Sequence, residues 1–256
     1  MLASTRRREI LSRLFAEGYA EAKALASDLG VDISTIRRDL DALERVGQIQ
    51  RTHGGARPLP GATAELPYAT KKAEHLEEKA AIAAAAARRV SDGDTVVLDS
   101  GSTTYELAVA LREHRGLTII TNDLRIAKYL AGLGEFRLLV AGGELLGSVY
   151  TLVGDRTVDF LSDYTADFAF LGADAVDVEA GITNTNTREL AVKRTMLSIA
   201  RTAIVLADHA KFGRRALSKV AGLGEVDLII TDSGLSDGMA EPFGDLLMRT
   251  EQAIPG

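Results

Sequence analysis

Residues 31–40 read Val-Asp-Ile-Ser-Thr-Ile-Arg-Arg-Asp-Leu, and this stretch predicts a helix that begins at Asp32. The Asp32 carboxylate can accept hydrogen bonds from the unpaired N–H groups of a first helical turn. Ile36, Leu40 and Leu43 recur at the spacing of one buried helical face. The opposite face carries hydroxyl and guanidinium groups, which belong to Ser34, Thr35, Arg37 and Arg38.

A second helical segment precedes this one. Residues 23–29 have helical apolar spacing and stop at Gly30. Two short helices joined by a glycine-bearing turn form the helix-turn-helix pattern, whose second helix enters the major groove of DNA. We therefore expect the four polar residues Ser34, Thr35, Arg37 and Arg38 to contact double-stranded DNA. The sequence leaves open which arginine reads a base edge and which binds a phosphate.

The flanking segments extend the pattern. Residues 6–15 predict a first helix, and its basic start at residues 6–8 fits either phosphate contacts or a solvated helix terminus. Residues 48–57 alternate and then turn at a double glycine, which predicts a short β-ribbon, the wing of a winged helix. We expect Arg51, His53 and Arg57 in this ribbon to face the DNA backbone or the minor groove.

Composition narrows the class of protein. The 256 residues are 46% hydrophobic and 26% charged, which is ordinary for a globular protein. The absence of cysteine excludes disulfides and thiolate metal sites, and it suits a cytoplasmic location. The N-terminus has no apolar signal-peptide core, and no apolar run approaches the ~18 residues of a membrane span.

The charge is distributed unevenly. The chain has a net charge of −6, but residues 1–58 carry 10 Lys and Arg against 8 Asp and Glu, so that the remainder has a net charge of −8. This asymmetry suggests a small DNA-contacting module attached to a larger acidic body. Since one short helix reads few base pairs, we expect a homodimer or homotetramer. The expected domains are a winged helix at 1–57, a proline-containing linker at 58–68 and an α/β domain at 69–256.

The acidic body alternates strands and helices. After a helix predicted over residues 69–90, continuous Val, Ile and Leu runs predict strands at 95–98, 117–120, 137–140, 168–171, 203–206 and 228–230. Runs of this kind, separated by helical segments, indicate a mostly parallel α/β sheet that is covered on both faces.

Polar residues follow these strands, at the edge where ligands bind in such sheets. The loop at 99–104 reads Asp-Ser-Gly-Ser-Thr-Thr and opens a helix, so its N–H groups and hydroxyls can surround an anion. No nucleotide-binding glycine motif is present, so we expect neither a nucleotide nor another cofactor. The four histidines lack metal-ligand spacing, so no metal site is expected. The candidate ligand residues at the strand ends are Asp99, Ser100, Gly101, Ser102, Thr103, Thr104, Thr121, Asn122, Gly142, Gly143, Asp174, Asp208 and Lys211.

The N-terminal motifs resemble those of the DeoR family of bacterial transcriptional repressors. The resemblance rests on Thr-Ile-Arg-Arg-Asp-Leu at 35–40 and Arg-Thr-His-Gly-Gly-Ala at 51–56, with supporting residues at 25–26, 29–31, 43 and 47. The family usually has serine at position 32. Asp32 keeps the helix cap but adds a negative charge close to where phosphates would lie.

The motifs after the strands resemble the effector domain of the same family, which is similar to ribose-5-phosphate isomerase and senses a phosphorylated sugar or polyol. They lie at 99–104, 121–122, 142–143, 171–173, 181–183, 206–208 and 211–213. The resemblance implies that Ser100–Thr104 hold the phosphate, with Lys211 as the counter-charge. It also implies that Asp99, Asn122, Asp174 and Lys193 surround the sugar hydroxyls, although Lys193 and Arg194 also fit a solvated helix face.

We therefore expect a repressor of a carbohydrate or polyol catabolic operon that a phosphorylated metabolite relieves. The alternatives are a sugar-phosphate isomerase or deaminase with a DNA-binding tail, and a structural DNA-binding protein without a ligand. The isomerases resembled here have an aspartate where this chain has Leu171, and a Lys-Gly-Gly stretch where it has residues 181–187. A pocket that lacks this cation and one carboxylate can bind without turnover, so Glu189 is interpreted as structural or ligand-contacting.

Overall fold

The computed structural model describes residues 2–45, 47–59, 74–147 and 149–250. The chain divides into two compact units, Met1–Glu74 and His75–Gly256. Each unit has its own hydrophobic core.

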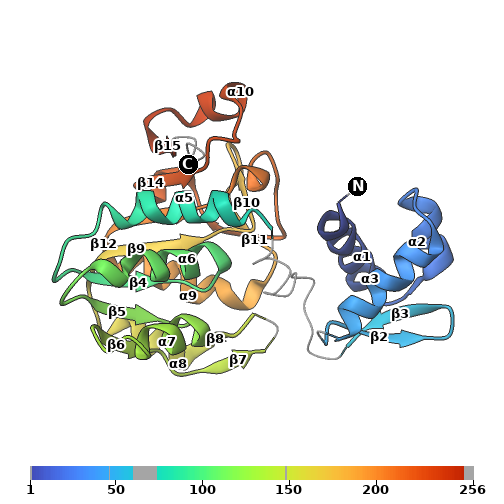
Figure 1. Ribbon diagram of the computed structural model, residues 1–256, viewed down its shortest axis with the longest axis horizontal. Coiled ribbons are helices and arrows are strands. Elements are labelled where there is room, and N and C mark those ends of the chain that lie inside the picture. The colour runs from blue at the N-terminus through green and yellow to red at the C-terminus, as the bar shows by residue number, and fades with distance from the viewer. Residues whose placement is uncertain (1, 46, 60–73, 148, 251–256) are drawn as a thin grey trace. The chain divides into compact units, whose positions relative to one another are not determined.

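The first unit is a winged helix (Figure 1). Its helices are α1 (Ala3–Glu17), α2 (Ala22–Asp28) and α3 (Ile33–Arg45), and its strands are β1 (Ala20–Glu21), β2 (Ile49–Thr52) and β3 (Gly55–Pro58). The strands form an antiparallel sheet in the order β1-β3-β2. The predicted helix-turn-helix and wing are therefore confirmed, and α1 is longer at both ends than the predicted helix at 6–15.

The core of this unit explains why α3 forms where it does. Ile36, Leu40 and Leu43 are at most 1% exposed and pack with apolar residues of α1. The backbone N–H of Ser34 donates to Oδ1 of Asp32 at 2.7 Å, which confirms the predicted cap. Burial of one face leaves the opposite face of α3 at the surface.

The second unit is built on a seven-stranded parallel sheet in the order β15-β14-β12-β9-β4-β5-β6. All six predicted strands are confirmed, with ends that shift by up to three residues. The seventh, β15, was not predicted. The strands are β4 (Thr95–Leu98), β5 (Thr118–Thr121), β6 (Arg137–Val140), β9 (Ala166–Gly172), β12 (Ala200–Leu206), β14 (Leu228–Thr231) and β15 (Leu247–Arg249).

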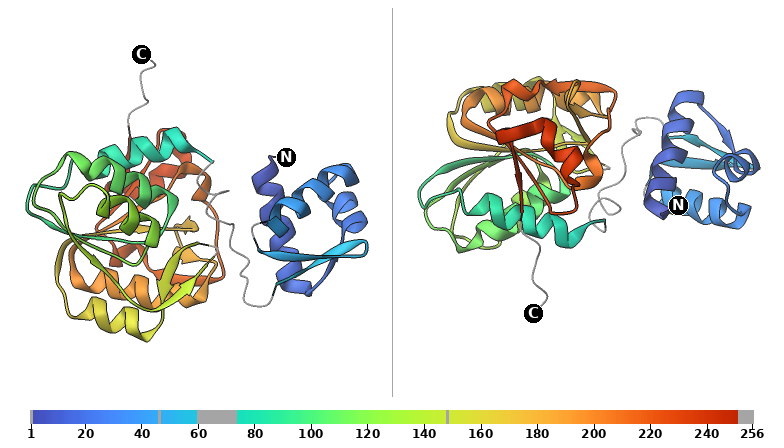
Figure 2. Two further views of the ribbon diagram at one scale, coloured as in Figure 1. Left: turned by 60° about the horizontal axis from the view of Figure 1, so that its bottom comes forward. Right: turned by 90° about the horizontal axis from the view of Figure 1, so that it is seen from above.

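Helices cover both faces of this sheet (Figures 1 and 2). Val96 and Leu98 pack in one core with α5 (Leu76–Ala87), α6 (Ser102–Ala110) and α7 (Leu124–Ala131). Val97 lies between them in β4 and packs in another core with α8 (Asp155–Ser162) and α9 (Leu190–Ile199). Since neighbouring strand residues point to opposite faces, a continuous apolar run is what this sheet requires.

Two small antiparallel sheets were not predicted. One pairs β7 (Glu144–Leu146) with β8 (Thr151–Val153). The other contains β10 (Ala175–Asp177), β11 (Gly181–Asn184) and β13 (Ser218–Ala221). Short 3-10 turns complete the unit, namely η1 (Leu111–Glu113), η2 (Thr187–Glu189), η3 (His209–Lys211), η4 (Leu223–Glu225) and η5 (Glu241–Leu246), together with α10 (Asp237–Ala240).

The helix predicted over residues 69–90 is shorter in the structure. It starts at Leu76, after His75, whose φ of 51° is left-handed and cannot continue a helix. It ends at Ala87, and residues 69–73 of the prediction lie outside the described residues. Pro58, which the sequence assigned to the linker, is the last residue of β3, and residues 60–68 are likewise not described. None of the helices in the described residues has the length and apolarity needed to cross a membrane.

Candidate functional site

The exposed face of α3 carries the residues predicted to contact DNA. Ser34, Arg37 and Arg38 are exposed, and Thr35 is half-buried. Hydrogen bonds from the Ser34 side chain and backbone lower the pKa of Asp32, and the charges of Arg38 and Arg37 lower it further. Asp32 is therefore ionised at neutral pH, and its negative charge lies on the same helix end as both arginines.

Two arginines at the basic start of α1 form ion pairs within this unit. The Nε atoms of Arg6 and Arg7 both donate to the carboxylate of Asp39, the latter at 2.8 Å, and Asp39 is 2% exposed. The solvated terminus is therefore incorrect for Arg6, which is buried, while a phosphate contact of half-buried Arg7 stays a prediction. Their ion pairs join α1 to the inner side of α3.

The wing is tied to α3 by Arg51. Its guanidinium donates to Asp41 and, at 3.3 Å, to the carbonyl oxygen of Arg37. Its backbone N–H donates to Oε1 of Glu44 at 2.8 Å. The guanidinium predicted to face DNA thus binds the recognition helix, while His53 is exposed at the turn of the wing. Arg57 donates to Oε1 of Gln50 across the ribbon.

In the second unit, β4 and β9 mark the point where the strand order reverses. From β4 the chain proceeds to β5 and β6 on one side, and it then returns to β9 on the other side of β4. Ligands of open α/β sheets bind at the carboxyl ends of strands at such a point. The loop that begins at Asp99 meets the end of β9 there, because the N–H of Gly172 donates to Oδ2 of Asp99 at 3.0 Å.

A buried ion pair lies beneath these loops. Nζ of Lys193, from α9, donates to Oδ2 of Asp99 and, at 2.9 Å, to the carbonyl oxygen of Gly172. Both side chains are almost fully buried. Burial lowers the pKa of Lys193, but the charges of Asp99, Glu189 and Asp174 and the hydrogen bond to Asp99 outweigh it, so the net pKa is raised. The ammonium is therefore charged at neutral pH.

The solvated helix face that the sequence allowed for Lys193 and Arg194 is incorrect for Lys193, whereas Arg194 is exposed. Lys193 is 3% exposed. Arg194 donates from Nε to the carbonyl oxygen of Val220 at 3.1 Å, and from Nη2 to that of Lys219 at 2.7 Å. These bonds attach α9 to β13.

Two further carboxylates lie near Lys193. Oδ2 of Asp174 accepts the backbone N–H of Thr185 at 2.9 Å. Oε2 of Glu189 accepts Nδ2 of Asn184 at 2.6 Å, and Glu189 is buried. Glu189 is thus part of a hydrogen-bonded network, in agreement with its interpretation as structural or ligand-contacting.

The predicted phosphate loop opens α6. The hydroxyl of Ser100 contacts that of Thr151, and Oγ1 of Thr104 donates to the carbonyl oxygen of Gly101 at 3.1 Å. Ser102, Thr103 and Thr104 are buried in the first turn. The first N–H groups of a helix lack acceptors within it, so this loop has the donors that an anion requires.

The hairpin of β7 and β8 is held over the ends of β4 and β5. The side-chain Nδ2 of Asn122 donates to the backbone carbonyl oxygen of Leu152 at 3.0 Å, and the backbone carbonyl oxygen of Asn122 accepts the N–H of Leu152 at 2.8 Å. Thr121 donates to the carbonyl oxygen of Leu98 at 2.8 Å. Asn122 Oδ1 is buried, and it accepts no hydrogen bond within the part of the chain that the structure describes. Such an acceptor is costly unless a ligand or water satisfies it.

Three of the remaining predicted ligand residues, Gly142, Gly143 and Asp208, have local structural roles. The carbonyl oxygen of Gly142 accepts the Thr157 hydroxyl at 2.7 Å. Gly143 has a φ of 147°, and an added Cβ would lie 2.2 Å from Oγ1 of Thr157, so only glycine fits. Oδ1 of Asp208 accepts the N–H of Ala210 and caps η3. Lys211, at the end of η3, is half-buried.

The sequence did not predict one group of potential metal ligands. His75, Glu78 and His209 bring potential metal-binding atoms within 4.8 Å of one another. The four-residue segment from His75 to Glu78 was a possible signal, because residues three apart share a helix face. His209 is far from His75 and Glu78 in the sequence, so its proximity to them is known only from the fold.

Two domain-family models match the chain. Residues 6–59 match a family described as DeoR-like helix-turn-helix domain, and residues 74–233 match one described as DeoR C terminal sensor domain.

Curated relatives match over nearly the full length. A glycerol-3-phosphate regulon repressor of Escherichia coli K12 is 34% identical over 233 residues, which cover 91% of this chain and 92% of the relative. An HTH-type transcriptional regulator of Haloferax volcanii is 36% identical and covers 92% of each chain. A putative aga operon transcriptional repressor of Escherichia coli O157:H7 is 35% identical and covers 91% of this chain and 87% of its own.

Among solved structures, a ribose 5-phosphate isomerase A from Methanocaldococcus jannaschii is 22% identical and covers 54% of this chain and 55% of its own, with a TM-score of 0.40.

Proposed function

This chain belongs to the DeoR family of transcriptional regulators, and we propose that it represses a carbohydrate or polyol catabolic operon until a phosphorylated metabolite binds its sensor domain. It is a DNA-binding regulator with a C-terminal sensor domain, and it is not an enzyme. The named relatives are transcriptional repressors and regulators, which argues against the isomerase or deaminase alternative.

For DNA binding, we propose that Arg37 and Arg38 contact the operator, with Ser34 and Thr35 beside them. Support comes from the exposure of both guanidiniums on the face of α3 opposite the core. We also propose that His53, which is exposed at the turn of the wing, contacts the DNA backbone or the minor groove. Arg51 has the additional task of fixing the wing against α3.

For effector binding, we propose that the loop at 99–104 holds the phosphate and that Lys211 supplies the counter-charge. Asn122, Asp174 and the Asp99–Lys193 pair would define the sugar side of the site. The observation that carries this proposal is the buried acceptor Asn122 Oδ1, which has no donor among the described residues. Thr121 at the end of β5 pairs with Leu98 at the end of β4, so the next residues of the two strands, Asn122 and Asp99, lie side by side. A ligand hydroxyl at this edge would satisfy this acceptor.

We also propose that residues 1–57 bind DNA together with Pro58 at the end of β3, that the rest of the segment up to residue 68 links the domains and that residues 69–256 sense the effector. The protein would act in the cytoplasm as a homodimer or homotetramer, since paired half-sites follow the symmetry of an oligomer.

Fluorescence anisotropy tests the function. The full chain is titrated onto labelled DNA from upstream of its own gene, and then a panel of sugar and polyol phosphates is added. Glycerol 3-phosphate is first in the panel because of the named relative. We expect one compound to release the DNA at micromolar to millimolar concentration. Failure to bind this DNA at low salt, or binding that no phosphorylated compound alters, would contradict the proposal.

A further inference from the structure

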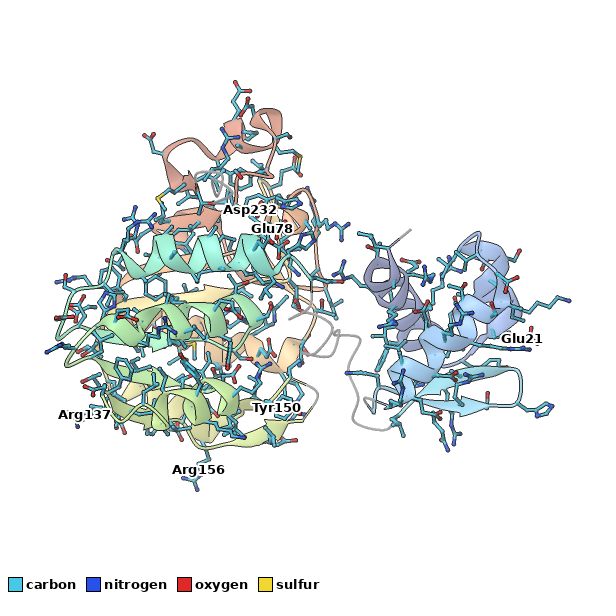
Figure 3. The ribbon with its side chains drawn as sticks, in the orientation of Figure 1. Glu21, Glu78, Arg137, Tyr150, Arg156 and Asp232 are labelled. Carbon is cyan, nitrogen blue, oxygen red and sulfur yellow. The ribbon has the colours of Figure 1, made fainter. Side chains whose placement is uncertain are left out.

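We propose that the sensor domain has a binding site for a divalent transition metal ion, formed by His75, Glu78 and His209. The site does not depend on the proposed effector. Its three side chains come from the start of α5 and from η3 at the end of β12. Figure 3 shows Glu78 at this end of the sheet, beside Asp232.

The three side chains converge. Nδ1 of His75 lies 3.5 Å from Oε1 of Glu78. The rings of His75 and His209 are 5.0 Å apart between centroids, and one ligand atom from each of the three residues lies within 4.8 Å of the others. Metal bonds of ~2.0–2.2 Å place tetrahedral ligand atoms about 3.3–3.6 Å apart, so small side-chain rotations close the site. All three residues are half-buried, which leaves this freedom.

The backbone positions His75 for this role. His75 has a φ of 51° and immediately precedes the first residue of α5. It therefore stands outside the helix while Glu78 lies in the first turn. A left-handed conformation is uncommon for a residue other than glycine, and such residues gather at functional sites.

Asp232 supports the assignment because it binds His209 and orients its ring. Its Oδ1 contacts Nδ1 of His209 at 2.7 Å, and its Oδ2 accepts the backbone N–H of the same residue at 2.7 Å. Asp232 is 2% exposed. A carboxylate bonded to one ring nitrogen fixes the tautomer and leaves the other nitrogen, Nε2, as a lone-pair donor, which is the usual arrangement behind a metal-binding histidine.

The packing around Asp232 also requires a small residue. A Cβ added at Gly234 would lie 2.7 Å from both Oδ1 of Asp232 and Nδ1 of His209. The N–H of Gly234 donates to the same Oδ1 at 2.8 Å. The buried carboxylate therefore makes two hydrogen bonds with His209 and a third with Gly234, which together fix its own position and that of the His209 ring.

The donor set indicates the class of ion. Two imidazole nitrogens and one carboxylate oxygen suit Zn²⁺ and its neighbours, whereas Mg²⁺ and Ca²⁺ prefer oxygen ligands. Three protein ligands leave a fourth position for water or another small ligand. An ion there would join the start of α5 to η3.

Zinc titration of the full, tag-free chain tests the proposal. The protein is stripped with a chelator and titrated with Zn²⁺ in competition with a chromophoric chelator. We expect one tight equivalent per chain and a higher melting temperature with the metal. His75→Ala, Glu78→Gln and His209→Ala should each weaken this equivalent at least tenfold.

Two further variants distinguish zinc binding at this site from zinc binding by any exposed histidine and from loss of the fold. His53→Ala removes an exposed histidine of the other unit and should retain full affinity. Asp232→Asn should weaken binding about 10- to 100-fold while the metal ligands remain. Circular dichroism without metal checks that each variant folds. Wild-type affinity in the folded His75→Ala and Glu78→Gln proteins, or an equal loss in His53→Ala, would overturn the proposal.

Discussion

Lys193 is the clearest case of a residue whose role depends on the fold. Its position in the sequence fits a helix surface or a ligand contact, yet its ammonium lies in the interior against Asp99 and Gly172. Removing one partner of a buried ion pair leaves the other charge without compensation, which is far more costly than losing a surface pair.

We therefore expect Lys193→Met to destabilise the sensor domain by about 3–5 kcal/mol, since Asp99 would remain buried and unpaired. Urea unfolding followed by circular dichroism measures the loss. Arg201→Ala breaks the exposed pair with Asp167 and should cost less than ~1 kcal/mol. Equal losses in the two variants would show that the Asp99–Lys193 pair is not a buried, coupled unit.

Asp32 offers a second test at this scale. Because the hydrogen bonds from Ser34 lower its pKa, its stabilising charge is present at neutral pH and is lost only as the pH falls through that lowered value. Asp32→Ser keeps the cap but removes a negative charge beside Arg37 and Arg38. Operator affinity at fixed salt should rise about two- to fivefold, the effect of ~0.3–1 kcal/mol for a charge at a helix terminus. Unchanged affinity would place Asp32 away from the phosphates.

Among the elements, α3 has the most direct connection to function. Its core face and its cap fix the helix, the pairs of Arg6 and Arg7 with Asp39 hold it against α1, and Arg51 holds the wing beside it. The opposite face can then be changed without loss of structure.

Replacing both Arg37 and Arg38 by alanine should reduce operator affinity at least thirtyfold, because each base or phosphate contact contributes about 1–3 kcal/mol. Anisotropy titration measures the affinity, and circular dichroism checks the fold. Arg112→Ala, which removes an exposed arginine of the sensor domain, is the matched control. A double variant that binds like this control would mean that α3 is not the recognition helix.

The sequence analysis succeeded for elements with strong local patterns. The six predicted strands were found because each contains a continuous apolar run, and in β4 and β5 successive residues of the run are buried on opposite faces of the sheet. In contrast, β15 reads Leu-Met-Arg and is identified by its pairing with β14. The hairpin of β7 and β8 has strands of three residues and is fixed by contacts from Asn122, which a local pattern does not contain.

The candidate site shows the same division. The loop at 99–104 and the residues at other strand ends were found because parallel strands bring their carboxyl ends to one edge. The burial of Lys193 and the convergence of His209 with His75 and Glu78 depend on which strands are neighbours, and the sheet order determines this.

At the scale of the whole molecule, the account requires two binding events to be coupled. A regulator of this kind works only if the effector binds one state of the protein better than another, and by linkage the operator must then weaken effector binding by the same factor. The sites lie in separate units of the chain. A variant of the sensor site should therefore change the response to effector without changing the affinity for DNA.

The most direct test is an anisotropy titration of the operator complex with the releasing phosphate, for the wild-type chain and for Lys211→Ala. Lys219→Ala serves as a control, since it removes a lysine from β13 of the same domain. We predict equal operator affinity for all three proteins, release of DNA from the wild type and the control, and little or no release from Lys211→Ala. Release of Lys211→Ala at the wild-type concentration would contradict the assignment of the phosphate site.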